Sequence, residues 1–215
     1  HAFRVVSGLD SMVLGDEQIL GQFREAFKAA VEQGQAGSSL HQLAQSALRV
    51  GKRVHTDTGI GRHGASVVEV ALAEAARHAG SLAGCEVVVI GTGSMSSLAA
   101  SVAAAQGAKV TVVGRTAAAV HRLAQAVHGR GAQLVDLDAH LRTADVVVSA
   151  TGATGLLVTK DHLERVMAGA PAHMFVCDLA LPHDTDPRIV EIPGVQRLDL
   201  AGIAVLPQAK VAADG

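Results

Sequence analysis

Residues 87–100 read VVVIGTGSMSSLAA, and this stretch decides the fold. Its consecutive Val and Ile residues are typical of a parallel strand that is buried on both faces. The small and apolar residues after Gly93 predict a helix. In a dinucleotide-binding βαβ unit, a residue such as Gly91 permits the tight turn after the strand. Gly93 would let backbone N–H groups approach a pyrophosphate at the positive end of the helix.

The predicted cofactor-binding turn comprises Gly91, Thr92, Gly93, Ser94, Met95 and Ser96. Its third fingerprint position is Ser96, where glycine is usual. A Gly-x-Gly pair alone also occurs in ordinary strand-to-helix turns, so the surrounding pattern has to decide. The apolar strand before the turn and the βαβ pattern around it favour a nucleotide.

Valine-rich runs continue along the chain and alternate with amphipathic segments. They occupy residues 86–91, 108–114, 132–136, 144–151, 172–180 and 194–199. Alternation of buried strands with helices indicates parallel pairing. The sequence therefore predicts an α/β fold, a doubly wound parallel sheet of the Rossmann type.

Residues 18–80 follow a helical period instead. Apolar residues recur at intervals of three and four, and Gly34 and Gly37 separate the first two segments. A third helix is predicted to begin at Ser66, because Ser66 and Glu69 have the spacing of a capping box. A helical segment thus precedes the sheet.

Composition excludes several classes of protein. The 215 residues include no Trp or Tyr, and a net charge of −2 without a long basic run argues against a phosphate-driven nucleic-acid binder. No signal peptide or membrane-spanning run is evident, so we expect a soluble, cytoplasmic protein. Cys85 and Cys177 make neither a disulfide framework nor a zinc pattern, and no metal site is predicted.

The end of the second strand indicates which cofactor binds. An acidic residue at this position would hold the ribose hydroxyl of NAD, but the chain has Arg115 and Thr116. The guanidinium of Arg115 can pair with a 2′-phosphate and the Thr116 hydroxyl can hydrogen-bond to it, which predicts NADPH. The alternative is that Arg115 is an ordinary solvated arginine.

Two further strand ends point toward the same crevice. Candidates to line its nicotinamide side are Ser149, Thr151, Asp178, Pro182 and Asp184, which could equally be turn and capping residues. Cys177 follows an apolar run and is expected to be a buried, inert thiol rather than a nucleophile.

Residues 1–27, HAFRVVSGLDSMVLGDEQILGQFREAF, resemble the signature of the glutamyl-tRNA reductases. The resemblance continues in the family's order through GKRVHTDTGIGRHGASVVEVA, GTGSMSS, VVGRT and CDLALPHDTDP. It covers essentially the whole chain, and it is far more specific than the glycine turn alone.

The resemblance implies a central part of a three-domain enzyme. Residues 1–62 would end the catalytic, substrate-binding domain, 63–80 would form the linking helix, 81–205 the NADP-binding domain, and 206–215 the start of the dimerisation region. The family reduces glutamyl-tRNA with NADPH to glutamate 1-semialdehyde, the first step of tetrapyrrole synthesis from glutamate. The reaction passes through a thioester on a cysteine that lies upstream of His1, so the fragment alone is expected to be inactive.

The resemblance also assigns site residues. His1 matches a histidine important for activity, and the glutamyl group would be bound by Ser11, Asp16, Glu17, Gln18 and Gln22. The chain departs from the family in having Asp-Glu-Gln where Glu-Pro-Gln is usual, and in having His55 and His183 where arginine is usual.

The implied partners are glutamyl-tRNA, a second subunit in a homodimer, and the aminomutase that takes the semialdehyde, with no membrane. Lys52 and Arg53 could contact tRNA phosphates or simply face solvent. Two other functions stay open: an NADP oxidoreductase of the shikimate dehydrogenase type, and a non-catalytic nucleotide-binding module.

Overall fold

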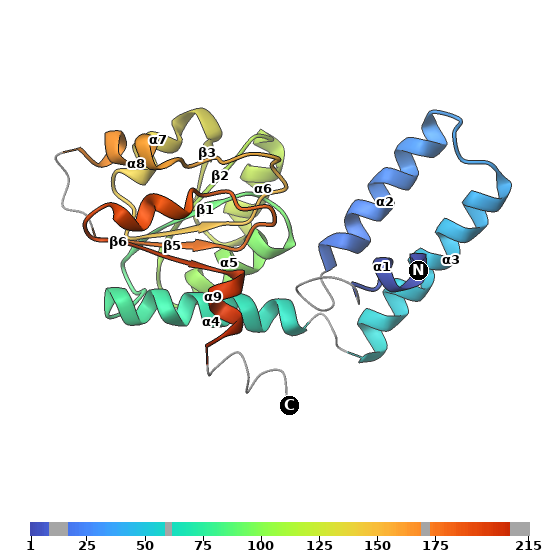
Figure 1. Cartoon of the computed structure of the whole chain (residues 1–215), viewed down its shortest axis with the longest axis horizontal. Helices are drawn as coiled ribbons and strands as arrows, with labels where there is room; N and C mark the ends of the chain where they lie inside the picture. Colours follow the sequence, from blue (N-terminus) through green and yellow to red (C-terminus); the bar gives the residue numbers. More distant parts are fainter. Residues whose placement is uncertain (9–16, 59–61, 169–172, 207–215) are drawn as a thin grey trace. The chain divides into compact units, whose positions relative to one another are not determined.

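The computed structural model describes residues 1–8, 17–58, 62–168 and 173–206. The chain forms two compact units, residues 1–66 and 67–215 (Figure 1). The functional domain borders expected from the sequence, at 62, 80 and 205, stay predictions, because compactness alone does not define a catalytic or a linking segment.

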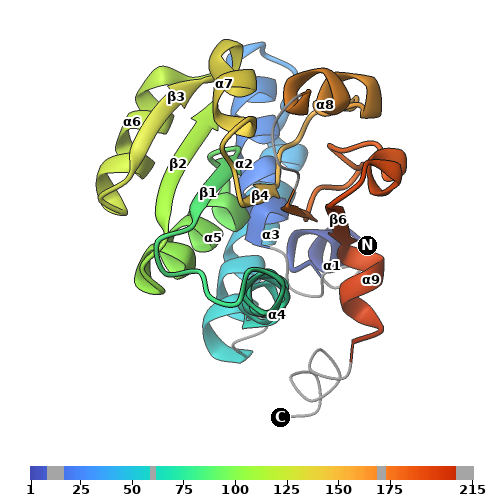
Figure 2. The same ribbon diagram turned by 90° about the vertical axis from the view of Figure 1, so that its left-hand side faces the viewer.

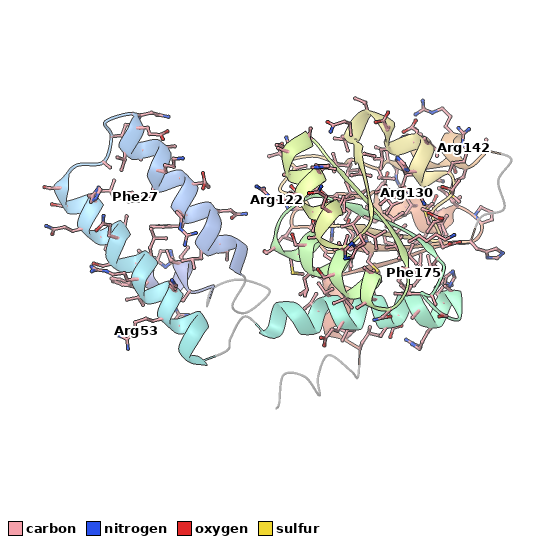
Figure 3. The ribbon with its side chains drawn as sticks, turned by 180° about the vertical axis from the view of Figure 1, so that it is seen from behind. Phe27, Arg53, Arg122, Arg130, Arg142 and Phe175 are labelled. Atoms are coloured by element: carbon pink, nitrogen blue, oxygen red, sulfur yellow. The ribbon has the colours of Figure 1, made fainter. Side chains whose placement is uncertain are left out.

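The first unit is helical. Its elements are α1 (Ala2–Val6), α2 (Glu17–Glu32) and α3 (Ser38–Thr58), and α4 (Arg62–Ala79) begins in it. Gly34, at a positive φ of 69°, follows α2 as expected. A Cβ on Gly51 of α3 would lie 2.8 Å from a methyl of the buried Val6, so this glycine lets α1 and α3 approach closely. Phe27 of α2 meets the ring of His41 edge-on at 5.1 Å (Figure 3).

The second unit is built on a six-stranded, fully parallel sheet of order β3-β2-β1-β4-β5-β6. The strands are β1 (Glu86–Ile90), β2 (Lys109–Gly114), β3 (Arg130–Gln133), β4 (Val146–Ser149), β5 (Met174–Asp178) and β6 (Val195–Asp199). The helices are α4, α5 (Ser94–Ala105), α6 (Ala117–Ala126), α7 (Leu137–Leu141), α8 (Lys160–Met167) and α9 (Leu200–Ala204), with short 3₁₀ turns η1 (Leu134–Asp136) and η2 (Pro187–Glu191). The predicted doubly wound Rossmann-type α/β fold is confirmed.

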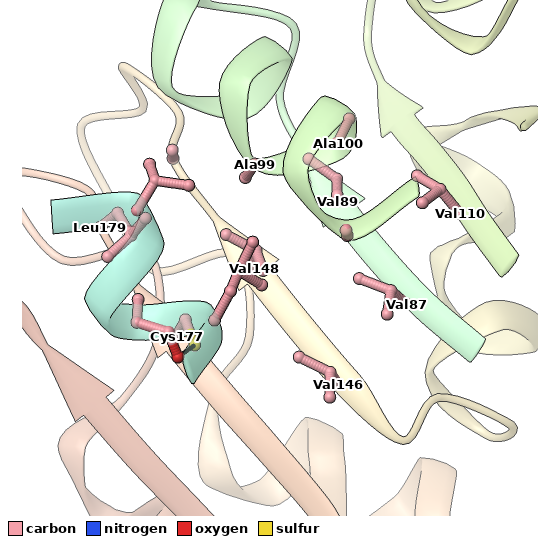
Figure 4. Close-up of a cluster of buried hydrophobic side chains, with 14 of the residues drawn as sticks. Val87, Val89, Ala99, Ala100, Val110, Val146, Val148, Cys177 and Leu179 are labelled. Carbon is pink, nitrogen blue, oxygen red and sulfur yellow. Dashed lines mark hydrogen bonds between the residues drawn. The ribbon is translucent and has the colours of Figure 1, made fainter. Parts of the chain in front are cut away.

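Helices cover both faces of the sheet (Figure 2). Val87 and Val89 of β1 pack with residues of α4, α5 and α6, whereas Val88 and Ile90 pack with residues of α7 and α8. Figure 4 shows the first of these cores, where Ala99 of α5 is fully buried. Neighbouring strand residues point to opposite faces, so the uninterrupted apolar run of β1 fills two cores at once.

Two expected boundaries were wrong. The third helix begins at Arg62, so Ser66 lies inside it and is not its N-cap. The residues just upstream of Ser66 include no proline, and the helix includes Gly64 in spite of the low helix propensity of glycine.

The third strand was expected at 132–136, but β3 is Arg130–Gln133 and Leu134–Asp136 form a 3₁₀ turn. β3 is an edge strand whose first two residues are exposed, so it lacks the apolar run on which the prediction depended. The apolar Val135 is 90% exposed in the following turn.

Candidate nucleotide-binding site

The order of the sheet reverses between β1 and β4, and the candidate site lies beyond the carboxyl ends of these two strands. Ligands of open α/β sheets bind at such a switch point. The backbone N–H of Gly91 donates to the carbonyl of Val113 at 2.8 Å, and that of Ala150 donates to the carbonyl of Ile90 at 3.1 Å. These bonds continue the ladders past the strand ends and hold the two loops next to each other.

Gly91 occupies a position that no larger residue fits. Its φ is +116°, and a Cβ there would lie 2.6 Å from Oγ of Ser96 and 2.7 Å from the carbonyl oxygen of Ala150. The Ser96 hydroxyl is buried and donates to that same carbonyl at 3.0 Å. The serine at the third fingerprint position therefore fastens helix α5 to the end of β4.

The first turn of α5 is open to an anion. Its N-cap is Gly93, no side chain caps it, and no acidic side chain lies in its first turn. The free N–H groups and the helix dipole both favour negative charge at this point. Met95 and Ser96 are buried, whereas Ser94 is exposed.

The end of β2 lies beside this turn. A Cβ on Gly114 would be 3.3 Å from the methyl of Thr92 in the β1 loop. Arg115 and Thr116 follow and are exposed, and Thr116 is the N-cap of α6 without a side-chain capping bond. The arrangement leaves a guanidinium and a hydroxyl for a group bound next to the glycine turn.

The carboxylate of Asp184 is fully buried and is held by the end of β4. Its Oδ2 accepts from the Ser149 hydroxyl at 2.7 Å and from the Thr151 N–H at 2.9 Å, and its Oδ1 accepts from the Thr151 hydroxyl at 2.6 Å. These three side chains were expected at the nicotinamide side of the crevice. They lie together at the carboxyl end of β4, where Ser149 and Thr151 both bond to Asp184, and their place beside a nicotinamide stays a prediction.

Asp178 ends β5 and is also fully buried. Its carboxylate accepts from the N–H and the hydroxyl of Thr185, at 2.9 and 2.7 Å, and from Nη2 of Arg197 at 3.0 Å. Only 6% of the Arg197 side chain is exposed. Sequence reasoning missed Arg197 and Thr185, although an arginine inside a predicted strand was a usable signal. Pro182, in contrast, is exposed.

Arg197 also donates to Asp199 at 2.8 Å, and Asp199 caps α9 by accepting from the Gly202 N–H at 2.8 Å. Partial burial alone would raise the pKa of the Asp199 carboxyl. The hydrogen bonds from Gly202 and Arg197, together with the positive charge of Arg197, outweigh this effect and hold the pKa below its usual range.

Asp199→Asn is expected to make stability less sensitive to acid. The carboxyl has a lower pKa folded than its unfolded value of about 3.9, so its contribution is complete above that value and is lost as the pH falls through the folded pKa. Urea unfolding of both proteins from about pH 7 to about pH 3 measures this, and the variant should lose less stability on acidification. Parallel pH profiles would contradict the assignment.

Neither cysteine is poised to react. Burial, with a smaller effect of the neighbouring Asp178 carboxylate, raises the pKa of the Cys177 thiol to about 12. Partial burial and the Asp145 carboxylate also raise the pKa of Cys85. Among the residues that the structure describes, no cluster of His, Cys, Asp or Glu could hold a metal ion, and no helix is long and apolar enough to cross a membrane.

Two family models match the chain in succession. The model described as glutamyl-tRNAGlu reductase, N-terminal domain, matches residues 1–58, and the model described as shikimate / quinate 5-dehydrogenase matches residues 73–204. Glutamyl-tRNA reductase 1 of a Nocardioides species is 47% identical over 205 residues, which are 95% of this chain and 47% of that protein. The chain belongs to the glutamyl-tRNA reductase family. Its residues 73–204 belong to the domain family named after shikimate / quinate 5-dehydrogenase.

The glutamyl-tRNA reductase of Kineococcus radiotolerans is 43% identical over 216 residues, which are 100% of this chain and 49% of that protein. The solved glutamyl-tRNA reductase of Methanopyrus kandleri has a TM-score of 0.64 and 29% identity, and the match covers 100% of this chain and 55% of that one. The chain thus spans about half the length of the curated relatives it matches. The fold and the family indicate a nicotinamide cofactor.

The residues that the glutamyl-tRNA reductase resemblance assigns to substrate lie in the first unit. Ser11 and Asp16 lie outside the described residues, and only the backbone of Glu17 and Gln18, at the start of α2, is described. Gln22 is exposed on α2, and His1 is exposed as the N-cap of α1. Their roles stay predictions.

The two departures from the family's arginines differ in what can be said of them. The side chain of His55 lies outside the described residues. His183 lies beside the buried ion pair, with its Nδ1 3.7 Å from Oδ2 of Asp178. Lys52 and Arg53 are exposed on α3.

Proposed function

We propose that this chain is part of an enzyme that reduces glutamyl-tRNA to glutamate 1-semialdehyde with NADPH and releases tRNA, the first step of tetrapyrrole synthesis from glutamate. The main support for the proposal is the N-terminus of α5, which follows Gly91 at the switch point of the sheet and is not capped by any side chain. It lies in a chain whose residues 1–58 match the N-terminal domain of the reductases.

The residues present fit a dinucleotide. The missing side chain of Gly91 permits the tight turn after β1, and that of the N-cap Gly93 would let the backbone come close to a pyrophosphate, whose charge the first-turn N–H groups of α5 would bind. Arg115 and Thr116 would hold a 2′-phosphate through a charged fork and a hydroxyl. When bound, the dihydronicotinamide supplies a hydride.

The two cysteines of this chain do not fit the thiol that carries the thioester. Cys177 is completely buried with a raised pKa, and Cys85 precedes β1, at the end of the sheet opposite the glycine turn. We therefore expect no semialdehyde when the chain alone is supplied with glutamyl-tRNA and NADPH. His1 would act beside the thioester by shuttling a proton or stabilising developing charge.

The cofactor proposal is tested by titrating the chain with NADPH and NADH while following nicotinamide fluorescence. NADPH should bind more tightly, and Arg115→Ala should weaken NADPH about tenfold while leaving NADH within about twofold, because only NADPH carries the 2′-phosphate. Arg122→Ala, which removes an exposed arginine of α6 (Figure 3), serves as the matched control.

Tighter binding of NADH by the unaltered chain would contradict the proposal, and so would equal losses in the Arg115 and Arg122 variants. In the first case the cofactor would be NAD, and in the second Arg115 would act only through the overall charge.

A second candidate is an oxidoreductase of the shikimate dehydrogenase type, favoured by the match over residues 73–204. It leaves residues 1–58 unexplained, since these match the reductase domain. Reduction of NADP by the chain in the presence of shikimate would support this candidate.

The partners follow from the proposed activity. Glutamyl-tRNA would be the substrate, with Lys52 and Arg53 as exposed candidates for phosphate contacts. We also propose a homodimer, and transfer of the semialdehyde to an aminomutase in the cytoplasm.

A further inference from the structure

The end of β4 contacts both the glycine turn and a buried carboxylate. Ala150 follows β4, and its carbonyl accepts from the Ser96 hydroxyl of α5 at 3.0 Å. The residues on either side of it, Ser149 and Thr151, both donate to Asp184. One carboxylate therefore holds both neighbours of the carbonyl to which α5 is fastened.

Asp184 is well placed to restrict the motion of residues 149–151. Its side chain is fully buried, and hydrogen bonds to an ionised oxygen are shorter and stronger than those between neutral groups. Its own backbone is anchored too, because its carbonyl accepts from the N–H groups of Leu157 at 2.7 Å and Val158 at 3.1 Å. Its N–H donates to Asp178 at 3.3 Å.

The Ala150 carbonyl is packed closely against Gly91 and Ser96. The space at Gly91 is so tight that a single Cβ would lie 2.6 Å from the Ser96 hydroxyl and 2.7 Å from the carbonyl. A displacement of Ala150 would therefore shift or release Ser96. Ser96 is in the first turn of α5, whose N–H groups would bind the pyrophosphate in the proposed function. The direction in which those groups point therefore depends on the position of the end of β4.

We propose that Asp184 is a positioning residue for the nucleotide: through Ser149 and Thr151 it holds the Ala150 carbonyl, and through the Ser96 hydrogen bond it sets the first turn of α5 for pyrophosphate binding. The inference rests on the proposed nucleotide function and deepens it. Asp184 itself does not touch the cofactor in this role, and its oxygens are occupied by protein donors.

The first measurement is amide hydrogen exchange of the chain without nucleotide. Asp184→Asn keeps the shape of the side chain and removes its charge. It should speed exchange about tenfold both at residues 149–153 and at the N–H of Ser97, which donates to the Gly93 carbonyl and closes the first turn of α5. Asp186→Asn is the matched control: Asp186 belongs to the same loop but bonds to Arg188 and caps η2, a role that asparagine also fills.

The second measurement is a double-mutant cycle on NADPH affinity. Asp184→Asn and Ser96→Ala should each weaken binding about tenfold, and the double variant should also be weakened about tenfold rather than about a hundredfold, because both changes break the same connection. Ser101→Ala, which removes an exposed hydroxyl bonded within α5, should leave the affinity unchanged. A general loss of stability would not produce this pattern.

If Asp184→Asn does not fold, Thr151→Val takes its place, because it removes one hydroxyl donor and retains the N–H donor to Asp184. Faster exchange confined to residues 149–153, or additive effects in the cycle, would overturn the inference. If the unaltered chain does not bind NADPH, the proposed function fails, while hydrogen exchange at α5 still decides whether Asp184 positions this turn.

Discussion

Gly91→Ala is expected to abolish nucleotide binding and to lower the free energy of unfolding by about 3 kcal/mol. Two costs combine in this figure: a non-glycine residue at a disfavoured backbone conformation costs about 1–3 kcal/mol, and an extra carbon in a packed interior costs about as much. At Gly91 the φ is +116°, and the new Cβ would meet a backbone carbonyl at 2.7 Å. Because this Cβ would also lie 2.6 Å from Oγ of Ser96, the strain would displace the first turn of α5.

Denaturant unfolding and NADPH titration of the Gly91→Ala protein measure the two effects. Gly155→Ala is the control, since a Cβ on Gly155 would meet nothing within 4 Å. A Gly91→Ala protein that kept both its stability and its affinity would show that the close approach at the switch point does not restrict this residue.

Arg197→Met is expected to lower the free energy of unfolding by about 3 kcal/mol, because it leaves a buried carboxylate without its cation. Asp178 is fully buried, and Arg197 is its ion partner at 3.0 Å with only 6% of the arginine side chain exposed. The same change removes the hydrogen bond to Asp199 and the bond from Nε of Arg197 to Thr185, at 2.9 Å. Methionine fills much of the volume that the arginine side chain leaves. The decrease in the free energy of unfolding therefore measures mainly the loss of the positive charge and its hydrogen bonds.

Arg188→Met provides the comparison for Arg197→Met. Arg188 pairs with Asp186 at 2.8 Å, but its side chain is 68% exposed, so water replaces the lost partner and a far smaller effect is expected. Urea unfolding of both variants at neutral pH measures the difference. Equal losses would contradict the view that burial makes the Arg197 pair decisive for stability.

Local patterns predicted the parts of the site that lie within one segment. The run from Val87 to Ile90, followed by Gly91 and Gly93, predicts a strand, a turn and a helix without reference to any other part of the chain. Arg115 could be assigned in the same way, because the end of β2 follows from its own valine run. The signal failed at β3, an edge strand that needs few apolar residues, and at Ser66, where a capping pattern lies inside a longer helix.

The partners of the buried acids could not be predicted from such patterns. Asp184 is 35 residues from Ser149 in sequence, and Asp178 is 19 residues from Arg197. Ligands of open parallel sheets bind beyond the carboxyl ends of the strands, and this rule placed Asp178 and Asp184 at the crevice. It did not indicate whether their carboxylate oxygens bond to a ligand or to other residues of the protein. That outcome depends on how two loops from different strands pack, and a residue's own neighbours in sequence carry little information about it.

The sequence by itself determined the Rossmann-type class of the second unit, the glycine turn and the family, because strand and turn signals are local and the family's motifs are long and ordered. Only the tertiary structure decided that Ser96 fastens α5 to β4 and that Asp184 and Asp178 are occupied by Ser149, Thr151, Thr185 and Arg197. The physical reason is that a buried polar group must find a hydrogen-bond partner, and in a parallel sheet the nearest donor is supplied by a neighbouring strand that can lie far away in sequence.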